Sequence, residues 1–123
     1  MVFKRFDKTA IDAAKLQPWL QQRGYRVTRT APTSKTYEHI DEVDWLLVGE
    51  PGKEILLHVL VFDTTLHAAG SAGRYVNDQK VENPGRPFAQ LNYGRTLFVA
   101  FARGTASDLE EFMDVLWSIR DER

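Results

Sequence analysis

Two stretches of the chain, residues 55–62 and 97–102, are apolar at nearly every position. Unbroken runs of this length, rich in Val, Leu and Phe, are typical of strands that are buried on both faces of a sheet. Residues 25–29 instead alternate apolar and polar side chains, which predicts a half-buried strand. Residues 44–49 predict a further strand, joined to the first apolar run by a turn at Pro51 and Gly52. The first three of these strands, in chain order, can form a meander.

Two other segments have the spacing of amphipathic helices. In the first, Leu16, Trp19 and Leu20 fall within one turn, residues 9–12 resemble a capping box, and Gly24 marks the end. The second begins at Ser107, which we expect to be its N-cap. Its apolar positions recur every three or four residues and should pack on the sheet; they are Leu109, Phe112, Met113, Leu116 and Ile119.

Residues 64–95 contain several Gly and Pro and show little periodicity. A structureless loop of that length is uncommon in a compact domain, so we expect a short helix at 87–93, opened by Pro87. Residues 68–76 are expected to be mobile. Because strand 97–102 follows this long crossover, we predict that it pairs parallel to a central neighbour.

The element order is therefore helix, three strands, a partly helical segment, strand and helix. It predicts an α+β (or α/β) fold for residues 1–123 as a single domain, with a mixed four- to five-stranded sheet flanked by helices. The composition, 43% hydrophobic and 27% charged, is that of a folded globular protein. Without cysteine the chain has no disulfides and no thiolate metal site. No run is long enough to span a membrane, and the N-terminus lacks the apolar core of a signal peptide, so we expect a cytoplasmic protein without membrane contact.

The net charge of −1 conceals an uneven distribution. Residues 1–35 hold eight Lys or Arg but two acidic residues, and residues 74–103 interleave five basic residues with aromatic ones. Such residues suit phosphate contacts and base stacking, and they suit a protein interface equally well. We therefore expect nucleic acid or a protein partner to bind at Lys4, Arg5, Arg23, Arg26, Arg29, Lys35, Arg74, Lys80, Arg86, Tyr93 and Arg95.

The segments 23–29 (RGYRVTR), 43–48 (VDWLLV) and 97–102 (LFVAFA) together resemble the restriction-endonuclease-like (PD-(D/E)xK) fold, closest to the archaeal Holliday-junction resolvases, over about residues 9–105. The resemblance implies a nuclease scaffold in which Asp44 is the first carboxylate of a Mg²⁺ site. The second carboxylate and the lysine of that family fall on His58 and Leu60. A neutral imidazole is a poor Mg²⁺ ligand and leucine carries no charge, so the active site is degenerate. This predicts a non-catalytic binding, accessory or inhibitor protein that needs no cofactor.

Three alternatives remain open. A metal-dependent nuclease would use an atypical site of Asp44, His58 and Asp63. A transition-metal site could draw on His39, Asp41, Asp44, His58, Asp63 and His67, with His39, Asp44 and His58 as the candidate ligands, but the spacing matches no known ligand motif, so no metal is predicted. The element order also resembles that of small type III secretion chaperones, which would imply a homodimer that binds protein.

Overall fold

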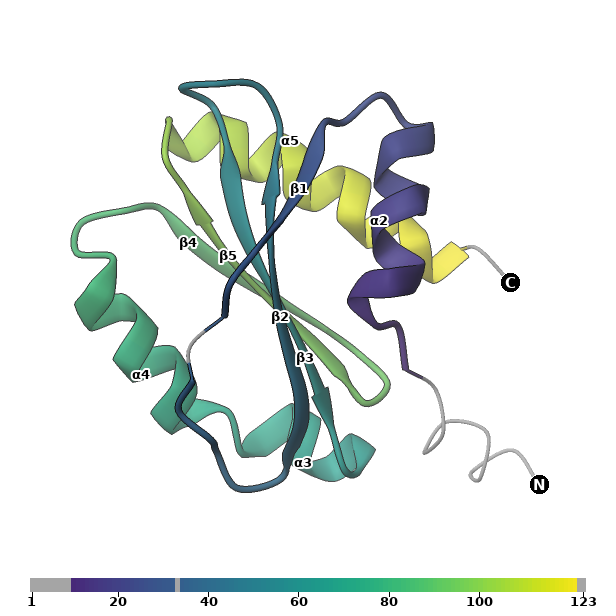
Figure 1. Ribbon diagram of the computed structural model, residues 1–123, viewed down its shortest axis with the longest axis vertical. Coiled ribbons are helices and arrows are strands. Elements are labelled where there is room, and N and C mark those ends of the chain that lie inside the picture. The colour runs from purple at the N-terminus through teal and green to yellow at the C-terminus, as the bar shows by residue number, and fades with distance from the viewer. Residues whose placement is uncertain (1–9, 33, 122–123) are drawn as a thin grey trace.

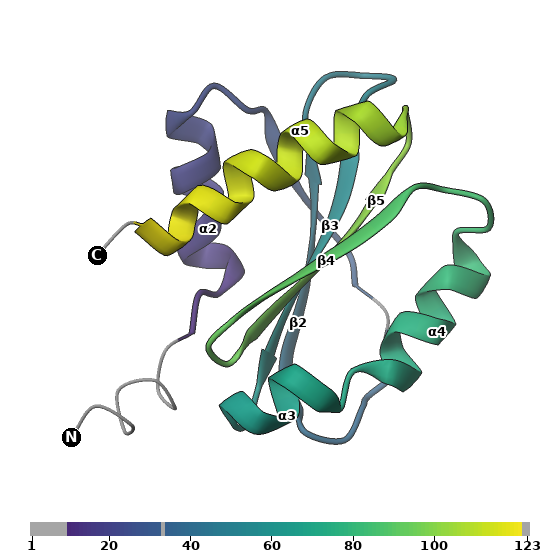
Figure 2. The ribbon, with the colours of Figure 1, turned by 180° about the vertical axis from the view of Figure 1, so that it is seen from behind.

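The computed structural model describes residues 10–32 and 34–121. Its centre is a five-stranded sheet with the strand order β1-β2-β3-β5-β4, in which every neighbouring pair is antiparallel. Helices cover both faces of this sheet (Figures 1 and 2). In chain order the elements are α2 (Ala13–Gln22), β1 (Val27–Thr30), β2 (Ile40–Val48), β3 (Ile55–Phe62), α3 (Thr65–Gly70), α4 (Gly73–Glu82), β4 (Phe88–Tyr93), β5 (Thr96–Ala102), α5 (Ala106–Trp117) and the 3-10 helix η1 (Ser118–Asp121).

The α+β class, the flanking helices and the meander of the first three strands are confirmed. Helix α2 begins after Asp12, whose carboxylate accepts a hydrogen bond from the Lys15 amide at 2.9 Å. It ends before Gly24, which has a φ of +89° that favours glycine. The Thr9 part of the expected capping box lies outside the described residues. Strand β2 begins at Ile40, four residues earlier than predicted.

The segment between β3 and β5 differs from the prediction. Residues 88–93 form strand β4 rather than a helix, and residues 68–76 fall within α3, α4 and their junction rather than in a mobile loop. The reason is a two-residue turn, since Tyr93 pairs with Thr96 around Gly94 (φ +59°) and Arg95. This hairpin reverses the chain before β5. Strand β5 therefore runs antiparallel to β3, and the predicted parallel pairing and mixed sheet are wrong.

Strands β3 and β5 lie in the middle of the sheet, where all their residues are buried except the partly exposed Leu56. Their alternate side chains supply two separate cores. One core packs α2 and α5 against the first face of the sheet and includes Leu16, Leu20, Leu57, Phe98, Phe112 and Leu116. The other packs α3 and α4 against the opposite face and includes Leu60, Phe62, Tyr75, Val99 and Phe101. Within the described part of the chain, no helix combines the length and apolar character that crossing a membrane requires.

The N-cap of helix α5 lies two residues before the predicted one. Thr105 is the N-cap: its hydroxyl accepts from the Asp108 amide at 3.2 Å, and the Asp108 carboxylate accepts from the Thr105 amide at 3.0 Å. The hydrogen bond from the Thr105 amide to the Asp108 carboxylate is the largest cause that holds the pKa of Asp108 below its usual value. Ser107 is an exposed residue within the first turn.

Thr105→Ala should therefore lower the free energy of unfolding by about 1 kcal/mol, because one of the first amides of α5 loses its partner. Ser107→Ala is the matched control and should change stability by less than about 0.5 kcal/mol. Urea unfolding followed by circular dichroism measures both. Equal losses in the two variants would show that the capping box does not stabilise α5.

Candidate functional site

The structure does not bring the predicted catalytic residues together. Asp44 lies opposite Val59 on the α2–α5 face of the sheet, where the Arg29 guanidinium binds its carboxylate at 2.6 Å. His58 pairs with Trp45 across the strands, and its ring projects into the other face. The sheet therefore separates the two side chains. The set of Asp44, His58 and Asp63, and the metal set of His39, Asp44 and His58, are not assembled.

His58 is instead part of a buried polar network. The Tyr75 hydroxyl lies 2.6 Å from its Nδ1 and also accepts a hydrogen bond from Trp45 Nε1 at 2.8 Å. The tyrosine hydrogen is thus available to Nδ1, which fits the tautomer protonated at Nε2. His58 is fully buried, and burial alone lowers its pKa to about 3, so the ring is neutral at pH 7. His58 therefore serves the packing of α4 on the sheet.

Asp63 has different neighbours from those predicted. Its two carboxylate oxygens lie 3.0 Å from His39 Nδ1 and 2.7 Å from His67 Nδ1, at the end of the sheet beside α3. The bond to His67 lowers the pKa of Asp63, and the bond to Asp63 raises the pKa of His39. These are the side chains that could hold a metal among the described residues. The sequence offered His67 only as one of several histidines and aspartates in a loosely spaced metal set, although its i+4 spacing from Asp63 could have indicated the pair.

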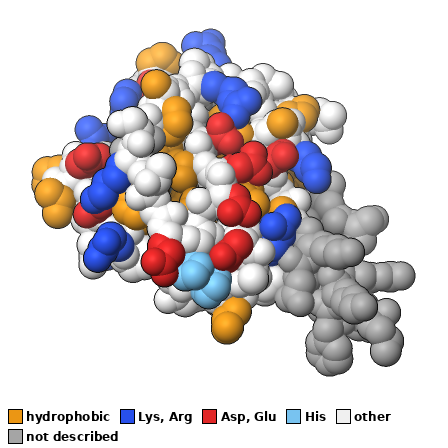
Figure 3. Space-filling model, turned by 60° about the horizontal axis from the view of Figure 1, so that its bottom comes forward, with side chains coloured by type: hydrophobic (Ala, Val, Ile, Leu, Met, Phe, Trp, Pro, Cys, Tyr) orange, Lys and Arg blue, Asp and Glu red, His pale blue; other side chains and the backbone are white. Residues whose placement is uncertain are grey.

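The predicted binding residues do not form one basic surface. Several are occupied by neighbours: Lys35 binds the Asp78 carboxylate at 2.6 Å, and Arg95 donates to the Phe62 carbonyl at 3.2 Å. Two cations cover aromatic rings, Arg23 over Trp19 and Lys80 over Phe88. Arg74 lies in α4, Tyr93 in β4, and Arg26 and Arg86 in separate connecting segments, while Lys4 and Arg5 fall outside the described residues. Figure 3 shows a face on which acidic side chains gather near the middle and Lys and Arg side chains are spread around them.

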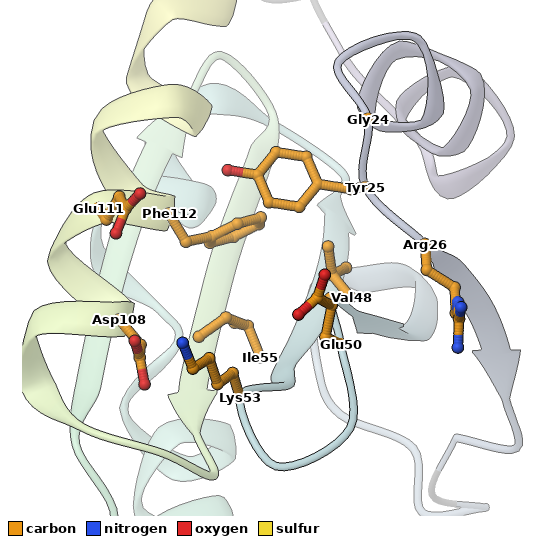
Figure 4. A pocket seen from close by; sticks show the side chains of 11 residues that line it. Gly24, Tyr25, Arg26, Val48, Glu50, Lys53, Ile55, Asp108, Glu111 and Phe112 are labelled. Carbon is orange, nitrogen blue, oxygen red and sulfur yellow. The ribbon is translucent and has the colours of Figure 1, made fainter.

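A small hollow of about 280 Å³ lies between the β2–β3 turn and α5 (Figure 4). Its floor is apolar, with the Tyr25 and Phe112 rings edge to face at 5.6 Å. Charges of both signs form its rim: Arg26 and Lys53 stand among Glu50, Asp108 and Glu111. This volume is slightly below the usual range for small-molecule sites, and the mixed rim selects no single ligand charge. The hollow is therefore a weak candidate for a catalytic or cofactor site.

The free edge of β4 is the stronger candidate. Among the strands that the structure describes, β4 is the last of the sheet and has β5 as its one neighbour. The Ala102 amide donates to the Pro87 carbonyl at 3.0 Å, and this bond shows which residues of β4 direct their backbone groups towards β5. Odd-numbered residues of β4 face β5, and the backbone groups of Phe88, Gln90 and Asn92 point outward. Among the described residues, no bonding partner lies at these three amides.

An apolar hollow flanks this edge on each face of the sheet. On the α5 side, a hollow of about 460 Å³ is lined chiefly by Pro87, Ala89, Leu109 and Met113, with Glu110 and Asp114 at the rim. On the helix α3 and α4 side, a hollow of about 450 Å³ is lined chiefly by Ala69, Ala72, Val76 and Phe88, with Lys80 and Gln90 nearby. The strand edge and its two hollows, which we call the β4 edge site, were missed from the sequence because residues 87–93 were assigned to a helix.

Comparisons with known proteins identify no relative: no family model matches the sequence, and no curated protein or solved structure matches the chain. The case for function therefore depends on the geometry alone.

Because His58 is buried and neutral, the free energy of unfolding should depend on pH. Its pKa falls from about 6.5 in the unfolded chain to about 3 in the fold, so the unfolded state binds more protons between these values. Above pH 6.5 His58 is neutral in both states and does not oppose folding. As the pH falls from 6.5 towards 3, the unfolded state takes up a proton that the folded state excludes, and the free energy of unfolding decreases. Between pH 6 and 5 this amounts to about 1 kcal/mol.

Urea unfolding at pH 6 and pH 5 should show that loss in the wild-type chain and a smaller one in His58→Gln, which cannot be protonated. Ser107→Ala, which leaves every histidine in place, is the control and should keep the wild-type pH dependence in this interval. An unchanged pH dependence in His58→Gln would contradict a buried neutral imidazole.

Proposed function

We propose that this chain is a non-catalytic protein-binding module that takes up an extended segment of its partner along the β4 edge site. The observation that carries the proposal is the unpaired outward ladder of Phe88, Gln90 and Asn92. Exposed strand edges pair readily with other chains, and natural proteins usually cover or charge an edge that must stay free. None of the six residues of β4 (Phe88–Tyr93) is charged.

The two hollows support an added strand rather than a helix or a small molecule. Successive side chains of a strand point to opposite faces, so an extended peptide on β4 would send alternate side chains towards α5 and towards α4. Each hollow has an apolar lining that could receive such a side chain. In this mode of recognition the backbone bonds supply affinity and the alternate pockets supply specificity.

A catalytic role is less well supported. The carboxylate of Asp44 is paired with Arg29, and the sheet separates it from His58. Nucleic acid is also less well supported, because the described basic residues are spread over several elements and several contact acidic or aromatic partners. A dedicated nucleic-acid site would concentrate them in one positive surface.

The second candidate is a homodimer of the secretion-chaperone kind. The chain runs helix, three strands, helices, two strands and helix, an order that resembles that of the small type III secretion chaperones. Two copies could pair through antiparallel β4 strands across a two-fold axis. Such a dimer would use the same edge, so one set of variants distinguishes both candidates from nucleic-acid binding.

Gln90→Pro should abolish strand addition. The proline removes an outward amide and places its ring on the free edge, while the inward bonds of Ala89 and Leu91 to β5 remain. Gln90→Thr is the control, since it keeps the amide and a strand-forming side chain. Peptides selected from a displayed library on the wild-type chain provide the probe, and fluorescence anisotropy measures their affinity. We expect a loss of about tenfold or more in Gln90→Pro and little change in Gln90→Thr.

Light scattering of the same three proteins tests the second candidate. A homodimer through β4 predicts a dimer mass for wild type and Gln90→Thr and a monomer mass for Gln90→Pro. Salt-sensitive DNA binding that survives Gln90→Pro and disappears in the Arg26→Glu, Arg29→Glu double variant would contradict the protein-binding proposal and favour nucleic acid.

A further inference from the structure

Three side chains from separate parts of the chain meet at the end of the sheet beside α3. His39 precedes β2, Asp63 follows β3, and His67 lies in α3 one turn beyond Asp63. Their potential ligand atoms all lie within 4.8 Å of one another, and the two imidazole rings stack with centroids 3.5 Å apart. Both histidines direct Nδ1 at the same carboxylate.

The spacing is close to that of a metal's ligand shell. The Nδ1 atoms lie 3.0 Å and 2.7 Å from the two different oxygens of the Asp63 carboxylate, somewhat less than the edge of about 3.4 Å between ligands in a tetrahedral zinc site with bonds near 2.1 Å. A metal ion would replace the two Nδ1 protons, and the side chains would have to shift so that both nitrogens and one carboxylate oxygen face the same ion. Each histidine would then carry its remaining proton on Nε2.

The outer hydrogen bond of His39 fits this change. Glu38 Oε1 lies 2.9 Å from His39 Nε2, so that nitrogen can donate to a carboxylate while Nδ1 binds the metal. Metal-bound histidines usually donate their other N–H in this way, which fixes the ring orientation and makes the ligand more basic. Glu38 is thus placed as a residue that orients a ligand.

The backbone also holds the three side chains in place. His39 has a φ of +71° and is the described non-glycine residue with a positive φ, a conformation that costs free energy and that is common at functional sites. The Asp63 amide donates to the His39 carbonyl at 2.9 Å, which ties the two loops together. The His67 amide donates to the Thr64 hydroxyl at 3.1 Å, which fixes the start of α3.

We propose that His39, Asp63 and His67 form a binding site for a divalent transition metal of the zinc class, through two imidazole Nδ1 atoms and one carboxylate oxygen. Imidazole nitrogen with carboxylate suits Zn²⁺, Co²⁺ or Ni²⁺ and disfavours Ca²⁺ and Mg²⁺, which prefer all-oxygen shells. Three protein ligands leave the fourth position of a tetrahedral ion open to water or to a partner's side chain. Histidine atoms lie among acidic side chains on this face (Figure 3), and that negative surround favours a cation. The inference does not depend on the β4 edge site.

Isothermal titration of the metal-free chain with Zn²⁺ alone tests the proposal. We expect one ion per chain, and a Co²⁺-loaded sample should show the visible absorption of a nitrogen- and oxygen-ligated ion. His39→Gln, Asp63→Asn and His67→Gln should each weaken Zn²⁺ binding by about a hundredfold or more, and Glu38→Gln by about tenfold. Glu82→Gln, which removes an exposed carboxylate at the end of α4 outside the cluster, should bind as the wild type does.

Thermal unfolding in the presence of a chelator checks that each variant folds. Zn²⁺ should raise the melting temperature of the wild-type chain and leave that of a folded His67→Gln variant unchanged, because the ion would join the start of β2 to α3. No binding by the wild type would overturn the proposal. Binding that persists unchanged in a His39→Gln, His67→Gln double variant would overturn it as well.

Discussion

The pairing of β3 with β5 is the constraint on which the rest of this structure depends. Both strands are apolar on their two faces, so each must lie between neighbours and beneath helices on both sides of the sheet. Helices α2 and α5 meet one half of this requirement, and α3 and α4 meet the other. The remaining strands then have to flank the pair: β2 and β1 continue the meander on one side, and β4 lies alone on the other. The exposed edge of β4 is thus a consequence of how the central pair is buried.

The core on the α4 side contains a buried polar network. His58 stands in the middle of β3, bound to the Tyr75 hydroxyl, which is bound in turn to Trp45. The His58 Nε2 atom is buried without a protein partner in the described residues, and an unsatisfied buried group costs about 1–3 kcal/mol. This network gives α4 a specific position on the sheet, since only one placement of Tyr75 reaches both rings. Because α4 forms a wall of one hollow beside β4, the network also helps to shape the proposed interface.

The sequence predicted much of this fold and little of its sites. The apolar runs, the Pro51-Gly52 turn and the helical spacing in α2 and α5 depend on local patterns, and these were identified. Strand β4 was not, because Pro87 suggested a helix start and the alternation of Ala89, Leu91 and Tyr93 is short. The turn at Gly94 and Arg95 was the available signal, and missing it also gave the wrong direction for β5.

The candidate sites depend on which face each side chain occupies, and that follows from register. In the sequence, Asp44 and His58 are a plausible pair of site residues. In the structure, Asp44 lies opposite Val59, and Trp45 lies opposite His58, so the side chains of Asp44 and His58 point to opposite faces of the sheet. The meeting of His39, Asp63 and His67 depends on a loop conformation with positive φ that no sequence pattern indicates. Long-range juxtapositions of this kind are fixed by tertiary structure.

Residue-resolved amide hydrogen exchange along β4 tests the central claim most directly. In the chain without a partner, the amides of Ala89, Leu91 and Tyr93 should be protected by β5, and those of Phe88, Gln90 and Asn92 should exchange rapidly. On addition of a bound peptide or partner, or on dimerisation, the second group should become protected as well. If the partner binds and these three amides continue to exchange rapidly, the β4 edge is not the interface and the account is wrong.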